Sequence, residues 1–175
     1  MDNLVLVRLN SEYCDYLRKF DDKVPYNYSQ KKLRPYVGVL FKVKDFYYFA
    51  PLTSPKKKHK TMRATIDFLK IDNGDMGAIN FNNMVPVFEN NIIRVDLDKT
   101  GISKSEEKYN IMLKEQLYWL NRNNAKVTKR SKTIYLMYNN GKLSPNIRKR
   151  CCNFKLLEEK CLEYNENIVK ETVNN

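Results

Sequence analysis

Glycine, histidine and suitably spaced cysteines are scarce in this chain of 175 residues. Its five glycines form no glycine-rich loop to cradle a phosphate and no flexible linker between domains. Its four cysteines contain no C-x-x-C pair, and a single histidine is available to complete a ligand set, which excludes the common zinc sites. We therefore expect reduced, partly buried thiols, no metal and no cofactor.

Long apolar runs are also missing. No stretch approaches the roughly 18 residues that a membrane span needs, and the first residues lack the basic start and cleavage site of a secretory signal. The length suits one domain with its own core, and 12 tyrosines, 8 phenylalanines and 1 tryptophan exceed what disordered chains carry. We expect a cytoplasmic protein without a membrane partner, folded as a single domain over residues 1–175, with roughly the last ten residues frayed.

Positive charge exceeds negative charge, and the excess is concentrated. The net charge is +12, and residues 121–150 alone contribute +9 without one acidic side chain. Such a block repels itself unless it faces a polyanion, and the aromatic rings offer stacking surfaces for bases. Nucleic acid is therefore the leading partner. The alternative is a basic surface that only keeps the protein soluble.

Two hydrophobic periodicities divide the chain. Short runs of β-branched and aromatic residues predict an antiparallel sheet from strands at 4–7, 36–43, 46–52, 68–71, 76–79, 84–87 and 91–95. Apolar residues at three-and-four spacing predict helices after an N-cap at Ser11, over 105–120 and 127–138, and after an N-cap at Asn153. The fold class is α+β.

Residues 51–60 gather hydroxyls, lysines and the histidine at the end of a predicted strand. RNA cleavage without a metal needs activation of the ribose 2′-OH, a cation against the charge that builds on the phosphate, and a proton for the leaving 5′-oxygen. Hydroxyl, lysine and histidine side chains can supply these roles. The alternative is a solvated basic turn capped by Ser54 and Pro55, and the spacing alone does not decide between the two.

Six sequence blocks then occur in a specific order over nearly the full length. They are SEYCDYLRKFDDKVP (11–25), RPYVGVLFK (34–42), YFAPLTSPKKKH (48–59), INFNNMVPV (79–87), MLKEQL (112–117) and CNFKLLEEKC (152–161). In these blocks the chain resembles the ToxN/AbiQ family, the endoribonuclease toxins of type III toxin–antitoxin and phage abortive infection systems. The resemblance implies a compact, MazF/Kid-like α+β fold in which helices wrap a barrel-like antiparallel sheet.

The resemblance also implies a chemistry and a set of residues. RNA is cut without a metal by attack of the 2′-OH, which leaves a 2′,3′-cyclic phosphate and a 5′-OH end. Lys56 would counter charge on the phosphate, Thr53 and Ser54 would position it, and Tyr13 or His59 would assist proton transfer. The loop after the Lys-Val-Pro element offers Tyr26 and Tyr28 for a second tyrosine, of which we choose Tyr28.

The partners implied are RNAs. A small repetitive RNA antitoxin, with pseudoknot-type repeats, would inhibit the toxin and be processed by it, and cellular and phage RNAs would be its substrates. The toxin would be monomeric without RNA and form a hetero-oligomer with it. The residues expected to bind RNA are Tyr28, Arg34, Lys57, Lys58, Lys60, Lys126, Lys129, Arg130, Lys132, Arg148, Lys149 and Arg150. The rival interpretations are a non-catalytic RNA-binding module and a basic scaffold for an acidic protein.

Overall fold

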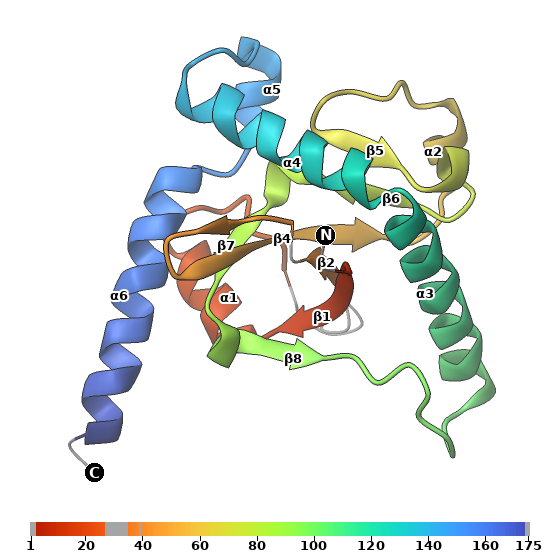
Figure 1. Ribbon diagram of the computed structural model, residues 1–175, viewed down its shortest axis with the longest axis horizontal. Helices are drawn as coiled ribbons and strands as arrows, with labels where there is room; N and C mark the ends of the chain where they lie inside the picture. The colour runs from red at the N-terminus through yellow and green to blue at the C-terminus, as the bar shows by residue number, and fades with distance from the viewer. Residues whose placement is uncertain (1–2, 27–34, 39, 174–175) are drawn as a thin grey trace.

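Eight short strands form one antiparallel sheet in the computed structural model, which describes residues 3–26, 35–38 and 40–173 (Figure 1). The strands are β1 (Val5–Leu9), β2 (Tyr36–Gly38), β3 (Lys42–Val43), β4 (Phe46–Thr53), β5 (Phe68–Lys70), β6 (Ala78–Asn80), β7 (Val85–Val87) and β8 (Ile92–Arg94). Each of the seven predicted strand regions overlaps at least one of them, and the region 36–43 contains both β2 and β3, because β-branched and aromatic residues favour a half-buried pleated surface.

The sheet is open. Its pairing order is β5-β6-β4-β2-β1-β8, and β3 and β7 both pair with β4 outside this path. A barrel would require the terminal strands β5 and β8 to pair with each other, but they lie at the top and bottom of the view in Figure 1. The predicted α+β class is confirmed, whereas the expected barrel does not close in the described residues.

Helices surround the sheet on several sides. In Figure 1, α6 runs along the left of the sheet, α3 along the right, and α4 crosses above it. Within the described residues, each helix is too short or too polar to cross a bilayer. The helices are α1 (Ser11–Arg18), α2 (Lys57–Thr61), α3 (Lys104–Arg122), α4 (Asn124–Asn139), α5 (Pro145–Arg150) and α6 (Phe154–Val173), with single 3-10 turns η2 (Asp72–Gly74), η3 (Phe81–Asn83) and η4 (Glu89–Asn91).

Side-chain caps mark where three helices begin. Helix α3 starts with a capping box, in which Ser103 and Glu106 bond each other's backbone N–H groups. Asn153 is confirmed at the start of α6, since its Oδ1 accepts from the Leu156 N–H at 3.3 Å. The cap of α1 is Asn10 and not Ser11, because the Asn10 side chain accepts from the backbone N–H groups of α1. Helices α2 and α5 were not predicted.

Aromatic side chains fill the core. The largest fully buried side chains are mostly aromatic: Tyr13, Tyr36, Tyr48, Phe46, Phe49, Phe81 and Phe154. These rings cannot stack on bases, so the stacking role expected from aromatic content is wrong for them. All four cysteines are buried free thiols, and the described residues contain no group of three His, Cys, Asp or Glu side chains that would hold a metal ion.

Glu158 joins α6 and α4 to the sheet. Its Oε1 accepts from the hydroxyl of Tyr48 on β4 at 2.8 Å and from that of Tyr135 on α4 at 2.7 Å. Burial, together with the Glu158 carboxylate, raises the pKa of both tyrosines, so both stay neutral donors. One carboxylate therefore satisfies two tyrosines that lie in different layers.

We expect Glu158→Ala to lower the free energy of unfolding by about 2–4 kcal/mol, because it leaves two hydroxyls without their acceptor. Glu158→Gln retains an acceptor oxygen and should cost less. Glu159→Ala, on the exposed neighbouring position, is the control for helix propensity and should change stability by well under ~1 kcal/mol. Chemical denaturation measures all three, and a Glu158→Ala variant as stable as the wild type would contradict this role.

Candidate active site

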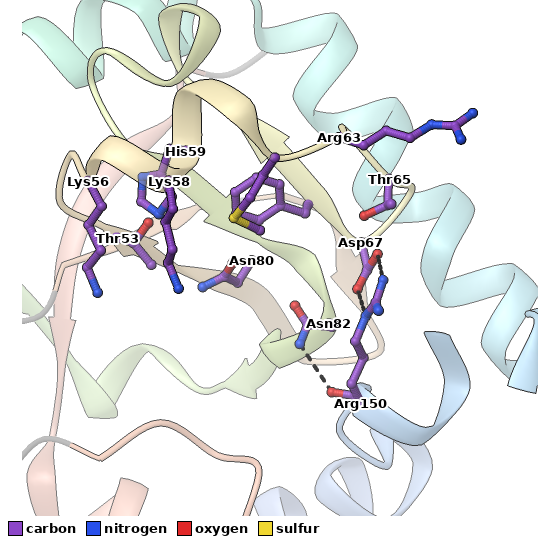
Figure 2. Close-up of a pocket in the computed structure, with 12 residues that line it drawn as sticks. Thr53, Lys56, Lys58, His59, Arg63, Thr65, Asp67, Asn80, Asn82 and Arg150 are labelled. Carbon is purple, nitrogen blue, oxygen red and sulfur yellow. Dashed lines mark hydrogen bonds and ion pairs between the residues drawn. The ribbon is translucent and has the colours of Figure 1, made fainter. Parts of the chain in front are cut away.

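A pocket of about 400 Å³ opens where strand β4 ends (Figure 2). Thr53 is the last residue of β4, and after Ser54 and Pro55 the chain turns into α2, with Lys56 at its N-cap position. The short helix turns the ring of His59 inward, into the same pocket as Lys56 and Lys58. The residues lining the pocket are Thr53, Lys56, Lys58, His59, Met62, Arg63, Thr65, Asp67, Phe68, Asn80, Asn82 and Arg150.

Three of the five predicted catalytic residues line this pocket. Thr53, Lys56 and His59 meet there, together with Lys58 from the predicted phosphate-binding set. Thr53 Oγ1 lies 3.4 Å from the Ala78 carbonyl oxygen of β6, to which it donates. Ser54 is exposed beside the pocket and is not part of its lining. The segment is solvated at 54–58 and at Lys60, but α2 turns His59 inward, so the interpretation as a solvated turn does not hold for the histidine.

His59 is buried, with 2% of its surface exposed. Its Nδ1 has no hydrogen-bond partner among the described residues, and its ring lies 5.8 Å from that of Phe68. Burial lowers the pKa of His59, and the charges of Lys56, Lys58 and Lys70 lower it further. The imidazole is therefore neutral at neutral pH and able to accept a proton.

The turn between β5 and β6 packs closely against the segment from Thr53 to His59. Gly77 has a φ of +93°, and a Cβ there would lie 2.0 Å from the Thr53 carbonyl oxygen. Gly74 has a φ of +100°, and its Cβ would lie 2.8 Å from the His59 carbonyl. Only glycine permits both the left-handed backbone and the close approach. The sequence showed a turn here, but nothing that linked it to the site.

Lys60 contacts the same turn through its side chain. Its ammonium group forms an ion pair with Asp75, and its carbonyl oxygen accepts from Lys70 Nζ at 2.8 Å. The Lys60 side chain is still 63% exposed, and its contact with RNA stays a prediction. Lys57 is exposed on α2, outside the pocket lining.

The opposite wall of the pocket comes from distant parts of the chain. Arg150 forms a bidentate ion pair with Asp67, with Nε–Oδ2 and Nη2–Oδ1 distances of 2.5 and 2.9 Å. Burial alone raises the pKa of Asp67, but hydrogen bonds from Arg150 and Thr65 outweigh it and bring the pKa below its usual value. Sequence reasoning placed Arg150 in the basic block and missed Arg63, Asp67, Asn80 and Asn82, of which only the two asparagines fall in a resembling block.

Arginines of the basic block, residues 121–150, make hydrogen bonds within the protein. Arg130 donates to the carbonyls of Thr65 and Ile66 at 2.6 and 3.3 Å, and Arg148 donates to the Tyr138 carbonyl at 2.8 Å. Arg150 likewise contacts the protein, through Asp67. Arg148 and Arg150 are nevertheless exposed, and the assignment of the three arginines as antitoxin contacts stays a prediction. The four lysines named from this block are exposed: Lys126, Lys129, Lys132 and Lys149.

Neither Tyr13 nor Tyr26 lines the pocket. Tyr13 is fully buried in the core, where its hydroxyl donates to the Pro86 carbonyl at 2.6 Å. Burial raises its pKa well above the usual value, so no catalytic role is assigned to it. Tyr28 and Arg34 lie outside the described residues. Tyr26, the alternative to Tyr28, is exposed, and the Arg18 guanidinium lies 4.3 Å above its ring.

Comparison with known proteins shows the family to which the chain belongs. Residues 5–162 match the family model described as toxin ToxN of the type III toxin–antitoxin system. The chain belongs to the ToxN family. The resemblance found in the six sequence blocks is thereby confirmed.

Relatives of known name belong to the same ToxN group. The chain is 37% identical over 171 residues to endoribonuclease ToxN of Bacillus thuringiensis subsp. kurstaki, covering 94% of this chain and 86% of the relative. It is 34% identical over 168 residues to endoribonuclease AbiQ of Lactococcus lactis subsp. lactis, covering 90% and 87%.

Solved structures of the ToxN group share the fold. The structure of AbiQ, a lactococcal anti-phage endoribonuclease of a type III toxin–antitoxin system, superposes with a TM-score of 0.80 at 30% identity and covers 94% of this chain and 99% of that one. A second structure, from a type III system whose toxin is selectively inhibited by a non-coding RNA pseudoknot, superposes with a TM-score of 0.78 at 33% identity, with the same coverage.

Because His59 is the single histidine, its imidazole can be titrated by NMR without overlap. We expect a pKa below the usual value of about 6.5. Lys58→Ala should move it back toward that value, while Lys57→Ala, outside the charges that act on the ring, should leave it unchanged.

The same shift affects stability. As the pH falls, His59 takes up a proton in the unfolded chain before it does in the folded chain. The contribution of neutral His59 to the free energy of unfolding should therefore be fully present above about pH 6.5 and be lost as the pH drops toward the folded pKa. His59→Gln should remove this slope. An imidazole pKa at or above 6.5 in the folded protein would contradict both expectations.

Proposed function

We propose that this chain is an endoribonuclease that cuts RNA by attack of a ribose 2′-OH on the adjacent phosphate. One observation supports this most: Lys56 and Thr53 meet at the end of the central strand, in a pocket that also holds Lys58, Arg63 and Arg150. The pocket contains four cations and one carboxylate, and that carboxylate is paired with Arg150. Such a site favours an anionic group such as a phosphate.

Each role follows from position. Lys56 offsets the negative charge that builds on the non-bridging oxygens as phosphorus becomes five-coordinate. Thr53, whose hydroxyl is anchored on β6, orients the phosphate from the strand end, and Ser54 contacts it from the exposed side. The bond from the 2′-oxygen to phosphorus forms as the bond to the 5′-oxygen breaks. A neutral His59 is suited to take the 2′-OH proton, and water from the open side of the pocket supplies the proton that makes the leaving 5′-oxygen a 5′-OH.

The same basic surface suits an RNA inhibitor. We propose that a small repetitive RNA antitoxin of the pseudoknot type binds the exposed lysines of α4 and α5 and is itself processed in the pocket. Cellular and phage RNAs are the remaining substrates. Without RNA the chain is monomeric, and RNA links the copies in the complex.

Two substrates test the chemistry. An RNA cut by the wild-type chain should leave a 2′,3′-cyclic phosphate and a 5′-OH end, and cleavage should persist in excess EDTA. The same RNA with a 2′-deoxy sugar at the cut site should bind but remain intact, because the nucleophile is missing. Cleavage of the deoxy substrate, or loss of activity on chelation, would show that the mechanism is wrong, and binding without any cleavage would favour the non-catalytic module.

Lys56→Ala should reduce the cleavage rate by a factor of about 100 to 1,000, as expected when transition-state electrostatics are lost. Lys57→Ala is the matched control, since it removes the same charge one residue outside the pocket, and it should keep most of the activity. Rates are measured on one defined RNA at saturating concentration. Equal losses in the two variants would assign the effect to general charge rather than to the site.

Antitoxin binding should weaken steeply with salt, because each neutralised phosphate releases counterions. The double variant Lys129→Glu/Lys132→Glu, on the exposed face of α4, should weaken antitoxin binding and lower the salt slope by about 2. Lys155→Glu, on the exposed side of α6, is the control and should leave both nearly unchanged. An affinity that hardly varies with salt would refute this binding mode.

A further inference from the structure

Asn82 lies on the pocket floor, between the lysines of α2 and the Arg150–Asp67 pair (Figure 2). It belongs to the 3-10 turn η3 and is half-buried. The cleavage chemistry above gives it no role, although it comes from one of the sequence blocks that define the family resemblance. An amide in a pocket for RNA can recognise a base by hydrogen bonding.

The donors of this amide are already committed. Asn82 Nδ2 donates to Asn83 Oδ1 at 2.9 Å and to the Arg150 carbonyl at 3.1 Å. Both partners are acceptors, which assigns the nitrogen to that side. The Asn83 amide is oriented in turn, since its Nδ2 donates to the Lys23 carbonyl at 2.8 Å.

The oxygen of the Asn82 amide is available to accept a hydrogen bond from a ligand. Its Oδ1 accepts no hydrogen bond from the described residues, and Figure 2 shows the oxygen turned toward the pocket. The backbone behind it is held as well, because the Asn82 carbonyl accepts from the Cys152 N–H at 2.8 Å and Arg150 is bound to Asp67. The pocket therefore contains a pre-oriented carbonyl oxygen without a donor among the described residues.

The surroundings of this oxygen fit a base rather than a phosphate. Met62, with 37% of its surface exposed, and Phe68 contribute apolar lining to the same pocket. A carbonyl oxygen repels phosphate oxygens but accepts from the exocyclic amino group of adenine, cytosine or guanine. Uracil has no amino group. Its one ring N–H is flanked by two carbonyl oxygens, and these repel Asn82 Oδ1 when the N–H approaches it.

We propose that Asn82 Oδ1 reads the amino group of one base close to the scissile phosphate and thereby disfavours uridine at that position. This inference rests on the proposed ribonuclease function and adds a specificity-determining residue to it. A single hydrogen bond lost on the wrong base corresponds to a preference of about tenfold.

The test is a map of cut sites in an RNA library randomised around the cleaved bond. The wild-type chain should show one position at which uridine is disfavoured by about tenfold, and Asn82→Ala should reduce that preference to less than about threefold. Asn90→Ala removes an amide of the same size from the exposed turn η4 and serves as the control, with an unchanged map. Thermal unfolding of each variant shows whether it is folded.

A second measurement needs only the wild-type chain. Replacing the exocyclic amino group of the preferred base by hydrogen in a defined substrate should lower cleavage about tenfold. Full activity on this substrate, or an Asn82→Ala map identical to that of the wild type, would overturn the inference while leaving the ribonuclease function in place. Failure of the wild-type chain to cut any RNA would overturn the proposed function and this inference with it.

Discussion

Strand β4 is the constraint on which the rest of the molecule depends. Its first half pairs with β3 and β7, and its second half with β2 and β6, so its backbone is bonded on both sides along most of its length. A shift in register would break four ladders and move its buried rings out of the core. Because Thr53 is the last residue of this strand, the centre of the sheet determines where the pocket opens.

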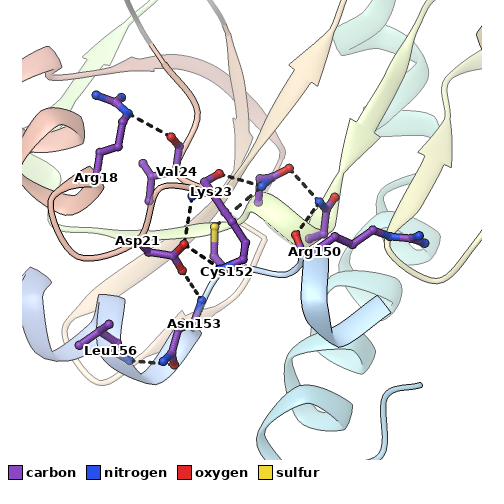
Figure 3. A network of polar contacts seen from close by, with 10 residues as sticks. Arg18, Asp21, Lys23, Val24, Arg150, Cys152, Asn153 and Leu156 are labelled. Carbon is purple, nitrogen blue, oxygen red and sulfur yellow. Dashed lines mark hydrogen bonds and ion pairs between the residues drawn. The ribbon is translucent and has the colours of Figure 1, made fainter. Parts of the chain in front are cut away.

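A polar junction completes the pocket from the far side. Asp21 is buried, and its carboxylate accepts from the N–H groups of Lys23 and Asn153 at 3.0 and 2.6 Å (Figure 3). This carboxylate ties the segment after α1 to the start of α6. The same segment holds Asn83 through the Lys23 carbonyl, so the orientation of the pocket floor depends on contacts between three remote stretches of chain.

Within the described residues, three arginines of the basic block contact the protein itself, which its named lysines do not. Arg130, Arg148 and Arg150 each donate to carbonyl or carboxylate oxygens of the protein, for which the planar guanidinium with several donors is suited. The named lysines of the same block stay exposed, where a compact ammonium on a flexible stem can follow an RNA backbone. Net charge indicated an anionic partner but did not show which of the cations also contact the protein.

Local chemistry was enough to predict much of the molecule. Period-two and three-and-four patterns located the strands and the helices α3, α4 and α6, since both depend on which neighbouring residues share a face. The segment from Thr53 to His59 was singled out by its hydroxyls, lysines and histidine, but only the resemblance to a family chose a site over a solvated turn. Burial of Tyr13, engagement of Lys60 by Asp75 and the pocket wall of Asp67, Asn82 and Arg150 were decided only by tertiary contacts. Those contacts join residues far apart in sequence, and a pattern within one segment carries no record of what packs against it.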